Sequence, residues 1–145
     1  MTSALSPEQI QARIEKANAA HGAIPADKLV RGLVRLFDFD AADEPDEFTF
    51  PAFSRASRDR IFGGQIIAQA MMAAAHTVDP DKQVHSLHAY FLRGGSEALP
   101  LHFRVHRDFD GRAFSNRRVV VRQEGKVIFN LTASFQKPEA DLIPW

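Results

Sequence analysis

The chain has 145 residues, enough for one domain of ordinary size, and its 45% hydrophobic and 25% charged residues are typical of a folded protein rather than a disordered one. Its 18 basic side chains balance its 18 acidic ones, which excludes the broad cationic surface that binding to a nucleic-acid backbone requires. The chain contains no cysteine, so disulfides, thiolate nucleophiles and cysteine-bound metals are excluded as well.

Two short helices are predicted before the first strand. A capping box at Ser6 starts a helix that runs to about Ala20, and a second helix follows over about 25–37. The first helix carries few apolar residues, so we assign residues 1–24 to an N-terminal helical extension and residues 25–145 to the main domain. The apolar residues of the second helix share one face, and they are Leu29, Val30, Leu33, Val34 and Phe37.

A loop, a strand and a third helix are predicted next. Residues 38–46 are acidic and polar, which indicates a loop, and residues 47–53 predict a strand that Pro51 distorts or places at an edge. A charged loop over 54–60 leads to a helix that runs through about Thr77. Almost no polar residue interrupts this helix, so we expect it to be buried nearly all round, with a curved sheet around it.

Four more strands are predicted after this helix, with no other helix between them. The second of these alternates clearly, with Leu101, Phe103 and Val105 on one face and with histidines and an arginine on the other. Turns at Asp110-Gly111 and Glu124-Gly125 separate the last three strands. We expect an antiparallel meander of the strands at 83–93, 99–107, 113–123 and 126–136.

The predicted fold is therefore α+β. It is a single hotdog, in which a five-stranded antiparallel sheet wraps around one long buried helix, with two N-terminal helices added. A lone hotdog leaves an edge of its sheet open, so we expect a second hotdog unit as partner, in a homodimer or in a complex with a complementary chain. The strand at 83–93 is the edge that we expect to pair.

No sequence feature indicates a membrane or a secretory pathway. The longest apolar stretch, from Ile66 to Ala75, is far shorter than the roughly 20 residues that a membrane-spanning helix needs. The first residues contain neither the basic region nor the apolar stretch of a secretory signal. We expect a cytoplasmic protein that has neither a membrane nor a nucleic acid as partner.

Four short motifs follow one another in order between about Leu29 and Glu139. They are Phe-Gly-Gly-Gln at 62–65 and the runs at 85–94, 114–119 and 132–136. Together they resemble the acyl-CoA thioesterase II family, whose members carry two hotdog units in tandem. The resemblance implies an acyl-CoA substrate or ligand, and it covers the first of the two units. No cofactor and no metal is expected.

The same resemblance separates this chain from the catalytic residues of the family. The family's catalytic set is an Asp, a Thr or Ser, and a Gln that activate a water, and it lies in the second unit. Those three positions have no counterpart in this chain. The resemblance therefore implies the N-terminal half of a double hotdog and leaves open whether the chain alone is an enzyme.

Four residues are candidates for binding the substrate. The start of the third helix, Gly63, Gly64 and Gln65, offers backbone amides and a helix dipole that suit a thioester carbonyl as it becomes an oxyanion, with Gly64 and Gln65 as the best candidates. Alternatively, the glycines only allow a tight turn and close packing of the helix. Arg117 could contact coenzyme A phosphates, or it could be a solvated charge on the sheet.

His85, Ser86 and His88 lie together on the strand after the helix and could line a pocket shared with a second hotdog unit. Because neighbouring residues of a strand point to opposite faces, His85 and Ser86 cannot face each other, whereas Ser86 and His88 share a face. A catalytic Ser–His pair also needs an orienting carboxylate, and none lies close in the sequence. The competing interpretation is a set of hydrogen-bonded polar groups at a strand interface.

Two functions from different classes follow. The first is hydrolysis of fatty-acyl-CoA to free fatty acid and CoA, in which a carboxylate of the other hotdog unit would activate water. The second is a non-catalytic hotdog that binds acyl-CoA or acts as a scaffold, which is favoured by the lack of any carboxylate between Gly64 and Val78. A hydratase is a third and weaker interpretation, because the Asp/His pair of that class is missing.

Overall fold

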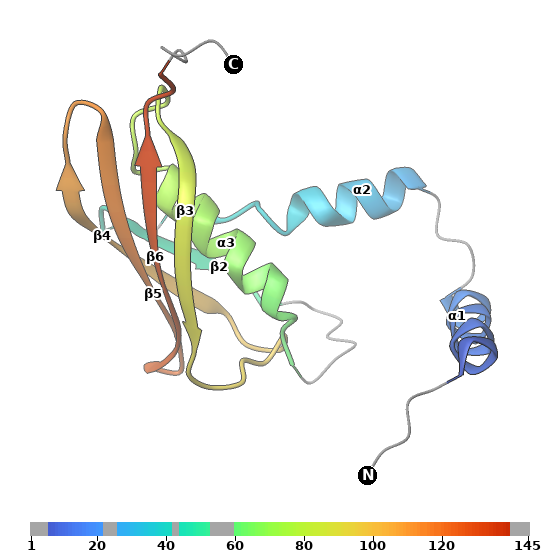
Figure 1. The fold of residues 1–145 in the computed structure, drawn as a ribbon. Coiled ribbons are helices and arrows are strands. Elements are labelled where there is room, and N and C mark those ends of the chain that lie inside the picture. Colours follow the sequence, from blue (N-terminus) through green and yellow to red (C-terminus); the bar gives the residue numbers. More distant parts are fainter. Residues whose placement is uncertain (1–5, 22–25, 42–43, 53–59, 140–145) are drawn as a thin grey trace. The chain divides into compact units, whose positions relative to one another are not determined.

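The structure is a computed structural model that describes residues 6–21, 26–41, 44–52 and 60–139. Three helices and six strands follow one another along the chain (Figure 1). In order they are α1 (Pro7–His21), α2 (Ala26–Arg35), β1 (Asp40–Ala41), β2 (Glu47–Phe50), α3 (Gly63–Ala75), β3 (Gln83–Phe91), β4 (Leu101–Asp110), β5 (Phe114–Gln123) and β6 (Lys126–Gln136).

The chain divides into two compact units, residues 1–35 and residues 36–145. The first unit holds α1 and α2, so this division lies after α2, while the division predicted from the sequence, after residue 24, lies before that helix. The capping box that was predicted for α1 is present, because the Ser6 amide donates to Gln9 Oε1 at 2.9 Å and the Gln9 amide donates to Ser6 Oγ at 3.2 Å. In α2 the apolar residues Val30, Leu33 and Val34 are exposed.

The second unit is an antiparallel sheet with α3 packed on one face (Figure 1). The strand order is β1-β2-β4-β5-β6-β3, and β1 contributes only two residues. The expected meander is wrong for β3, because β3 pairs with β6 while β4 pairs with β2 and β5. The physical reason is the connection at 92–100, which is long enough to pass β6 and β5 and reach the position of β4 inside the sheet. β3 is an edge strand, as predicted.

The core lies between α3 and the sheet. The predicted alternation in β4 is confirmed, since Leu101, Phe103 and Val105 are buried while His102 and Arg104 are exposed. On α3 the core-facing residues include three alanines that have no exposed surface, which lets the helix lie close to the strands. The rest of the core comes from β5 and β6, through Val119, Val121, Ile128, Phe129, Leu131, Ala133 and Phe135.

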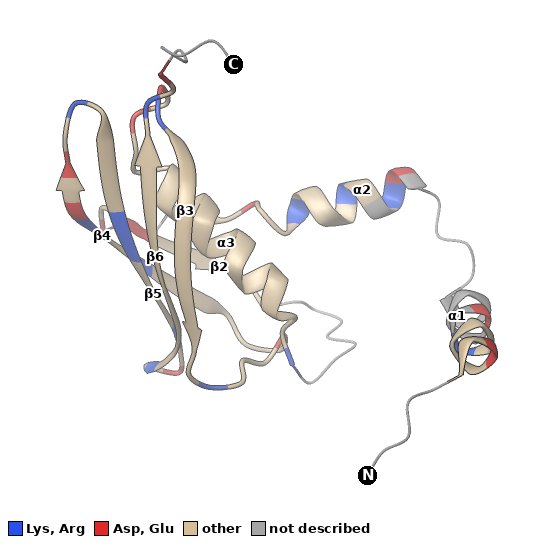
Figure 2. Ribbon diagram, in the orientation of Figure 1, with Lys and Arg blue, Asp and Glu red and all other residues tan. Residues whose placement is uncertain are grey.

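The surface of α3 that faces away from the sheet is open, so the expectation of burial nearly all round is wrong for this unit. Gly64, Met72 and Ala75 are exposed, because the sheet covers one side of the helix only. Figure 2 shows no charged residue along α3, so its open side is apolar as well. Within the part of the chain that the structure describes, no helix is long and apolar enough to cross a membrane.

Candidate functional site

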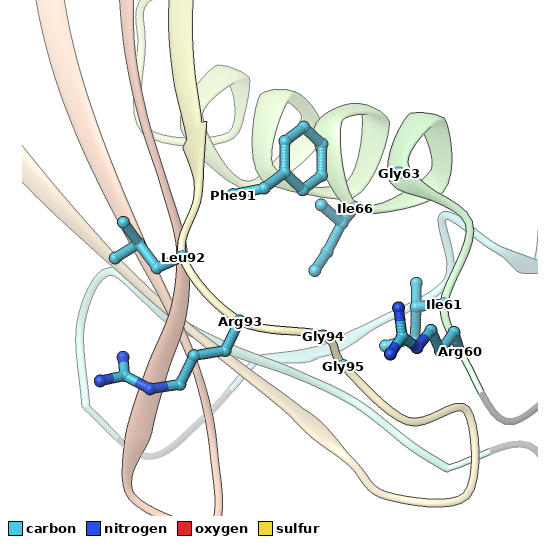
Figure 3. Close-up of a pocket in the computed structure, with 9 residues that line it drawn as sticks. All are labelled: Arg60, Ile61, Gly63, Ile66, Phe91, Leu92, Arg93, Gly94 and Gly95. Atoms are coloured by element: carbon cyan, nitrogen blue, oxygen red, sulfur yellow. The ribbon is translucent and has the colours of Figure 1, made fainter. Parts of the chain in front are cut away.

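A cavity of about 380 Å³ lies beside the N-terminus of α3, within the range of small-molecule sites (Figure 3). Its walls come from the start of α3, from the end of β3 and from the loop that follows β3. Apolar side chains provide one part of the lining, glycines a second part and arginines a third. The nine lining residues are Arg60, Ile61, Gly63, Ile66, Phe91, Leu92, Arg93, Gly94 and Gly95.

Backbone hydrogen bonds hold the two segments of the wall together. The Ile61 amide donates to the Gly95 carbonyl at 3.0 Å, which joins the residues before α3 to the loop after β3. The Leu92 and Arg93 amides both donate to the Ile128 carbonyl of β6, at 2.9 and 3.0 Å. A Cβ at Gly95 would lie 3.0 Å from the Cδ1 atoms of Ile61 and Ile128, so a larger residue here would have to displace both side chains.

The first turn of α3 offers two unpaired amides. The Gln65 amide donates to the Phe62 carbonyl at 3.0 Å, whereas the amides of Gly63 and Gly64 have no acceptor among the described residues. The first turn contains no acidic residue, and Phe62 caps it without a side-chain hydrogen bond. Of the two best candidates, Gly64 and Gln65, only Gly64 has an amide without an acceptor, and Gly63 shares that property.

The alternative role of the glycines, close packing, is supported at Gly63. A Cβ there would lie 3.1 Å from the ring of Phe91, which forms the wall of the cavity opposite α3. Phe91 is 57% exposed and also packs edge-on against the buried Phe129, with 5.0 Å between the ring centroids. Gly63 can therefore serve both roles. Its missing side chain leaves room for the ring of Phe91, and its backbone amide stays available to bind an oxyanion.

The three polar residues of β3 do not reach this cavity. Ser86 pairs with Ser134 and His88 with Thr132, which places both on the face of the sheet opposite α3, as their shared face in the sequence predicted. His85 Nε2 lies 2.9 Å from Ser134 Oγ on that same face. The expectation that His85 and Ser86 point to opposite faces is thus wrong, because a register shift between Val84 and Ser86 interrupts the alternation.

Arg117 is a buried structural residue. Its guanidinium is 1% exposed and donates to Thr77 Oγ1 and O at 2.8 and 2.9 Å, to the carbonyls of Phe109 and Asn116 at 3.0 and 2.9 Å, and to Asp110 Oδ1 at 2.6 Å. These bonds occupy its donors. Both interpretations from the sequence are therefore wrong: Arg117 is not available to bind CoA phosphates, and it is not a solvated charge on the sheet. Arg117 ties the end of α3 to the hairpin of β4 and β5.

The bond from Arg117 to Asp110 predicts a pH-dependent contribution to stability. It holds the pKa of the Asp110 carboxyl below its ordinary value of 3.8. A carboxylate with a lowered folded pKa stabilises the fold fully above the unfolded value and loses that contribution as the pH falls through the folded value. Asp110→Asn should therefore be less stable than the wild type near neutral pH, with a smaller difference below pH 3.8. Urea unfolding at both pH values measures this, and an unchanged difference would contradict it.

Within the described residues, no group of His, Asp and Glu side chains is arranged to hold a metal ion. No pattern in the sequence indicated Arg60 or Arg93 as parts of a site. The only nearby signal was the Gly94-Gly95 pair directly after a strand, which marks a place of close backbone approach.

Known proteins similar to this chain are acyl-CoA thioesterases. Human acyl-coenzyme A thioesterase 8 is 50% identical over 80 residues, which are 55% of this chain and 25% of that protein. Acyl-CoA thioesterase 2 of Haemophilus influenzae is 42% identical over 80 residues, or 55% of this chain and 28% of that protein. The matched residues thus span about a quarter of the length of these curated relatives.

Solved structures agree with the predicted fold. The crystal structure of an acyl-CoA thioesterase II from Mycobacterium marinum is similar with a TM-score of 0.66 and 36% identity, over 79% of this chain and 41% of that one. The predicted α+β hotdog is confirmed. The sequence profile described as "Acyl-CoA thioesterase N-terminal domain" matches residues 53–136. The chain therefore belongs to the acyl-CoA thioesterase family, as its N-terminal hotdog domain.

Proposed function

We propose that this chain acts in the hydrolysis of fatty-acyl-CoA to free fatty acid and CoA, as the N-terminal half of a double hotdog. The observation that carries the proposal is the cavity at the start of α3, where apolar walls meet Gly63, whose amide has no acceptor among the described residues. Membership of the thioesterase family supports the same substrate class. A role in fatty acid metabolism and a cytoplasmic location remain predictions.

The geometry suggests how a thioester would lie in the cavity. The carbonyl oxygen would accept hydrogen bonds from the amides of Gly63 and Gly64, which strengthen as negative charge develops on that oxygen. The acyl chain would lie against the apolar wall formed by Ile61, Ile66 and Phe91. Water would attack the carbonyl carbon, the new C–O bond would replace the C–S bond, and the CoA thiolate would leave and take up a proton.

The water also needs a base, and the described residues that line the cavity provide none. None of the nine residues that line the cavity is Asp or Glu, and α3 carries no carboxylate. The proposal therefore assigns the base to a second hotdog unit, which the family resemblance predicted. A non-catalytic hotdog that only binds acyl-CoA would use the same cavity and would differ in having no base supplied to it.

The free edge of β3 is the proposed contact with that second unit. β3 pairs only with β6, and its other edge has no strand beside it in the described part of the chain. Leu87, Tyr90 and Phe91 of this strand are exposed apolar or aromatic residues. Pairing with a strand of the second unit would satisfy the open backbone groups and cover these side chains. His85, Ser86 and His88 would then lie along that seam.

Release of free thiol from a panel of acyl-CoAs tests the proposed function. The purified chain is assayed alone and together with the second hotdog unit of the family, with acyl-CoA binding measured in parallel. Hydrolysis that depends on the second unit is the expected result. Binding without hydrolysis in both conditions would identify the non-catalytic hotdog instead, and ordinary thioesterase rates by the chain alone would show that the base lies within it.

Filling the cavity should remove binding. The side chain in Gly63→Leu would start 3.1 Å from the ring of Phe91 and would extend into the cavity. We expect acyl-CoA affinity to fall at least about tenfold, because the leucine and the displaced ring of Phe91 would occupy space that the ligand needs. Gly32→Leu is the matched control, because a Cβ at Gly32 meets nothing within 4 Å. Calorimetric titration measures both, and unchanged binding by Gly63→Leu would place the ligand elsewhere.

A further inference from the structure

Two arginines stand at the cavity and have no part in the chemistry described above. Arg60 directly precedes the segment that leads into α3, and Arg93 follows β3. Both side chains are exposed, and within the described residues neither forms an ion pair with a carboxylate. A single exposed arginine is common on a protein surface, but here two of the nine residues that line one cavity are arginines and none is acidic.

Arg60 lies beside the glycine loop, which is the Gly94-Gly95 segment that follows β3. A Cβ built on Gly94 would lie 3.8 Å from Arg60 Nε and 3.9 Å from Cζ, so the guanidinium lies against the backbone of this loop. The bond from the Ile61 amide to the Gly95 carbonyl holds the two segments side by side. Figure 3 shows Arg60 beside Ile61 and the two glycines. Within the described residues its guanidinium donates no hydrogen bond.

Arg93 lies on the other side of the cavity. Its Nη1 donates to the Val127 carbonyl at 2.6 Å, and Figure 3 shows its side chain extending away from Arg60. One of its five donors is thus occupied and the others are not. The nearest carboxylate along the glycine loop, Glu97, does not line the cavity and forms no ion pair with either arginine.

We propose that Arg60 binds a phosphate group of the coenzyme A moiety at the mouth of this cavity, while Arg93 adds positive charge from the opposite side without touching the same phosphate. This inference rests on the proposed function, because it takes acyl-CoA as the ligand. A guanidinium is planar and always charged, and its paired donors match phosphate oxygens in a bidentate geometry. The apolar wall would then hold the acyl chain while Arg60 holds the phosphorylated end. Arg60 is the principal contact, because Arg93 already donates to β6.

Titration calorimetry with three ligands tests this site. Hexanoyl-CoA carries every phosphate, hexanoyl-dephospho-CoA lacks the 3′-phosphate, and hexanoyl-pantetheine carries none. We expect Arg60→Gln to weaken binding of hexanoyl-CoA about tenfold, as the loss of a charge-assisted hydrogen bond predicts. Binding of hexanoyl-pantetheine should not change. Arg93→Gln should have a smaller effect of the same kind, and dephospho-CoA shows whether the 3′-phosphate is the one recognised.

The control is Arg122→Gln, which removes an exposed arginine from β5 that pairs in register with His102. It should leave the binding of all three ligands unchanged. If the wild type binds hexanoyl-CoA and hexanoyl-pantetheine equally, or if Arg60→Gln weakens both equally, the phosphate site is wrong and the proposed function stands. If the wild type binds neither compound, the proposed function fails and the phosphate site fails with it.

Discussion

Arg117→Ala is expected to lower the free energy of unfolding by about 3 kcal/mol, the range found when one partner of a buried ionic network is removed. The substitution removes the donor to the buried Thr77 carbonyl and to the part-buried carbonyls of Phe109 and Asn116, and it opens a void where the buried side chain lay. The remaining carboxylate, Asp110, is half-exposed and can be hydrated, which keeps the loss from being larger. Urea unfolding followed by circular dichroism measures it.

The neighbouring arginine provides the control for this prediction. Arg118 pairs with Asp108 on the opposite face of the sheet, and both side chains are more than one-third exposed. Arg118→Ala should therefore cost less than about 1 kcal/mol, as exposed ion pairs do. Arg117→Lys should lie between the two, because an ammonium group cannot reproduce the guanidinium's spread of donors. Equal losses for Arg117→Ala and Arg118→Ala would contradict the structural role of Arg117.

Phe129→Ala is expected to destabilise the protein by about 3 to 5 kcal/mol, because it empties a fully buried aromatic position. Phe129 has no exposed surface and lies on the face of β6 that packs against α3. Its ring also supports Phe91, the wall of the candidate site. We therefore expect the milder variant Phe129→Leu to fold and to bind acyl-CoA less tightly, as seen by thermal unfolding and calorimetry.

Phe114 is the matched phenylalanine on the opposite face. It is 43% exposed, lies near His85 with 6.1 Å between the ring centroids, and belongs to β5. Phe114→Ala should cost about 1 kcal/mol or less, since partial exposure in the folded state limits the apolar area lost. The same loss of stability for both phenylalanines would show that the core does not lie where the structure places it.

Local patterns in the sequence predicted the elements better than their arrangement. The capping box at Ser6 and the alternation of Leu101, Phe103 and Val105 were correct because each depends on residues close together in the chain. The partner of β3 could not be predicted, because alternation indicates a strand but carries no information about its neighbour. The actual partner is the last strand of the chain rather than the next one.

Two side chains, Arg117 and His85, show why it was harder to predict which face of the sheet a residue occupies. On β5 the core face carries Ser115 and Arg117 before its two valines, so its polarity is close to that of the outer face. Periodicity alone could not tell which face is buried, and a buried arginine looked like a solvated one. At His85 a single irregularity in register moves the side chain to the other face, and no local feature of the sequence indicates this irregularity.

The candidate site was found in part. Gly63 and Gly64 were recognised because a glycine pair at a helix start is a local signal. Arg60 and Arg93 lie on segments that only the fold brings together, through the bond between Ile61 and Gly95, so their joint position beside the cavity required the structure.

Backbone amide shifts in an NMR titration of the ¹⁵N-labelled chain with hexanoyl-CoA test the central claim most directly, namely that acyl-CoA binds at the N-terminus of α3. The account predicts saturable shifts at the four glycines that line or adjoin the cavity, which are Gly63, Gly64, Gly94 and Gly95. These glycines come from two segments of the chain. If their shifts change over the same range of ligand concentration, both segments contribute to one binding site. Shifts confined to Ser86 and His88, on the opposite face of the sheet, would contradict it.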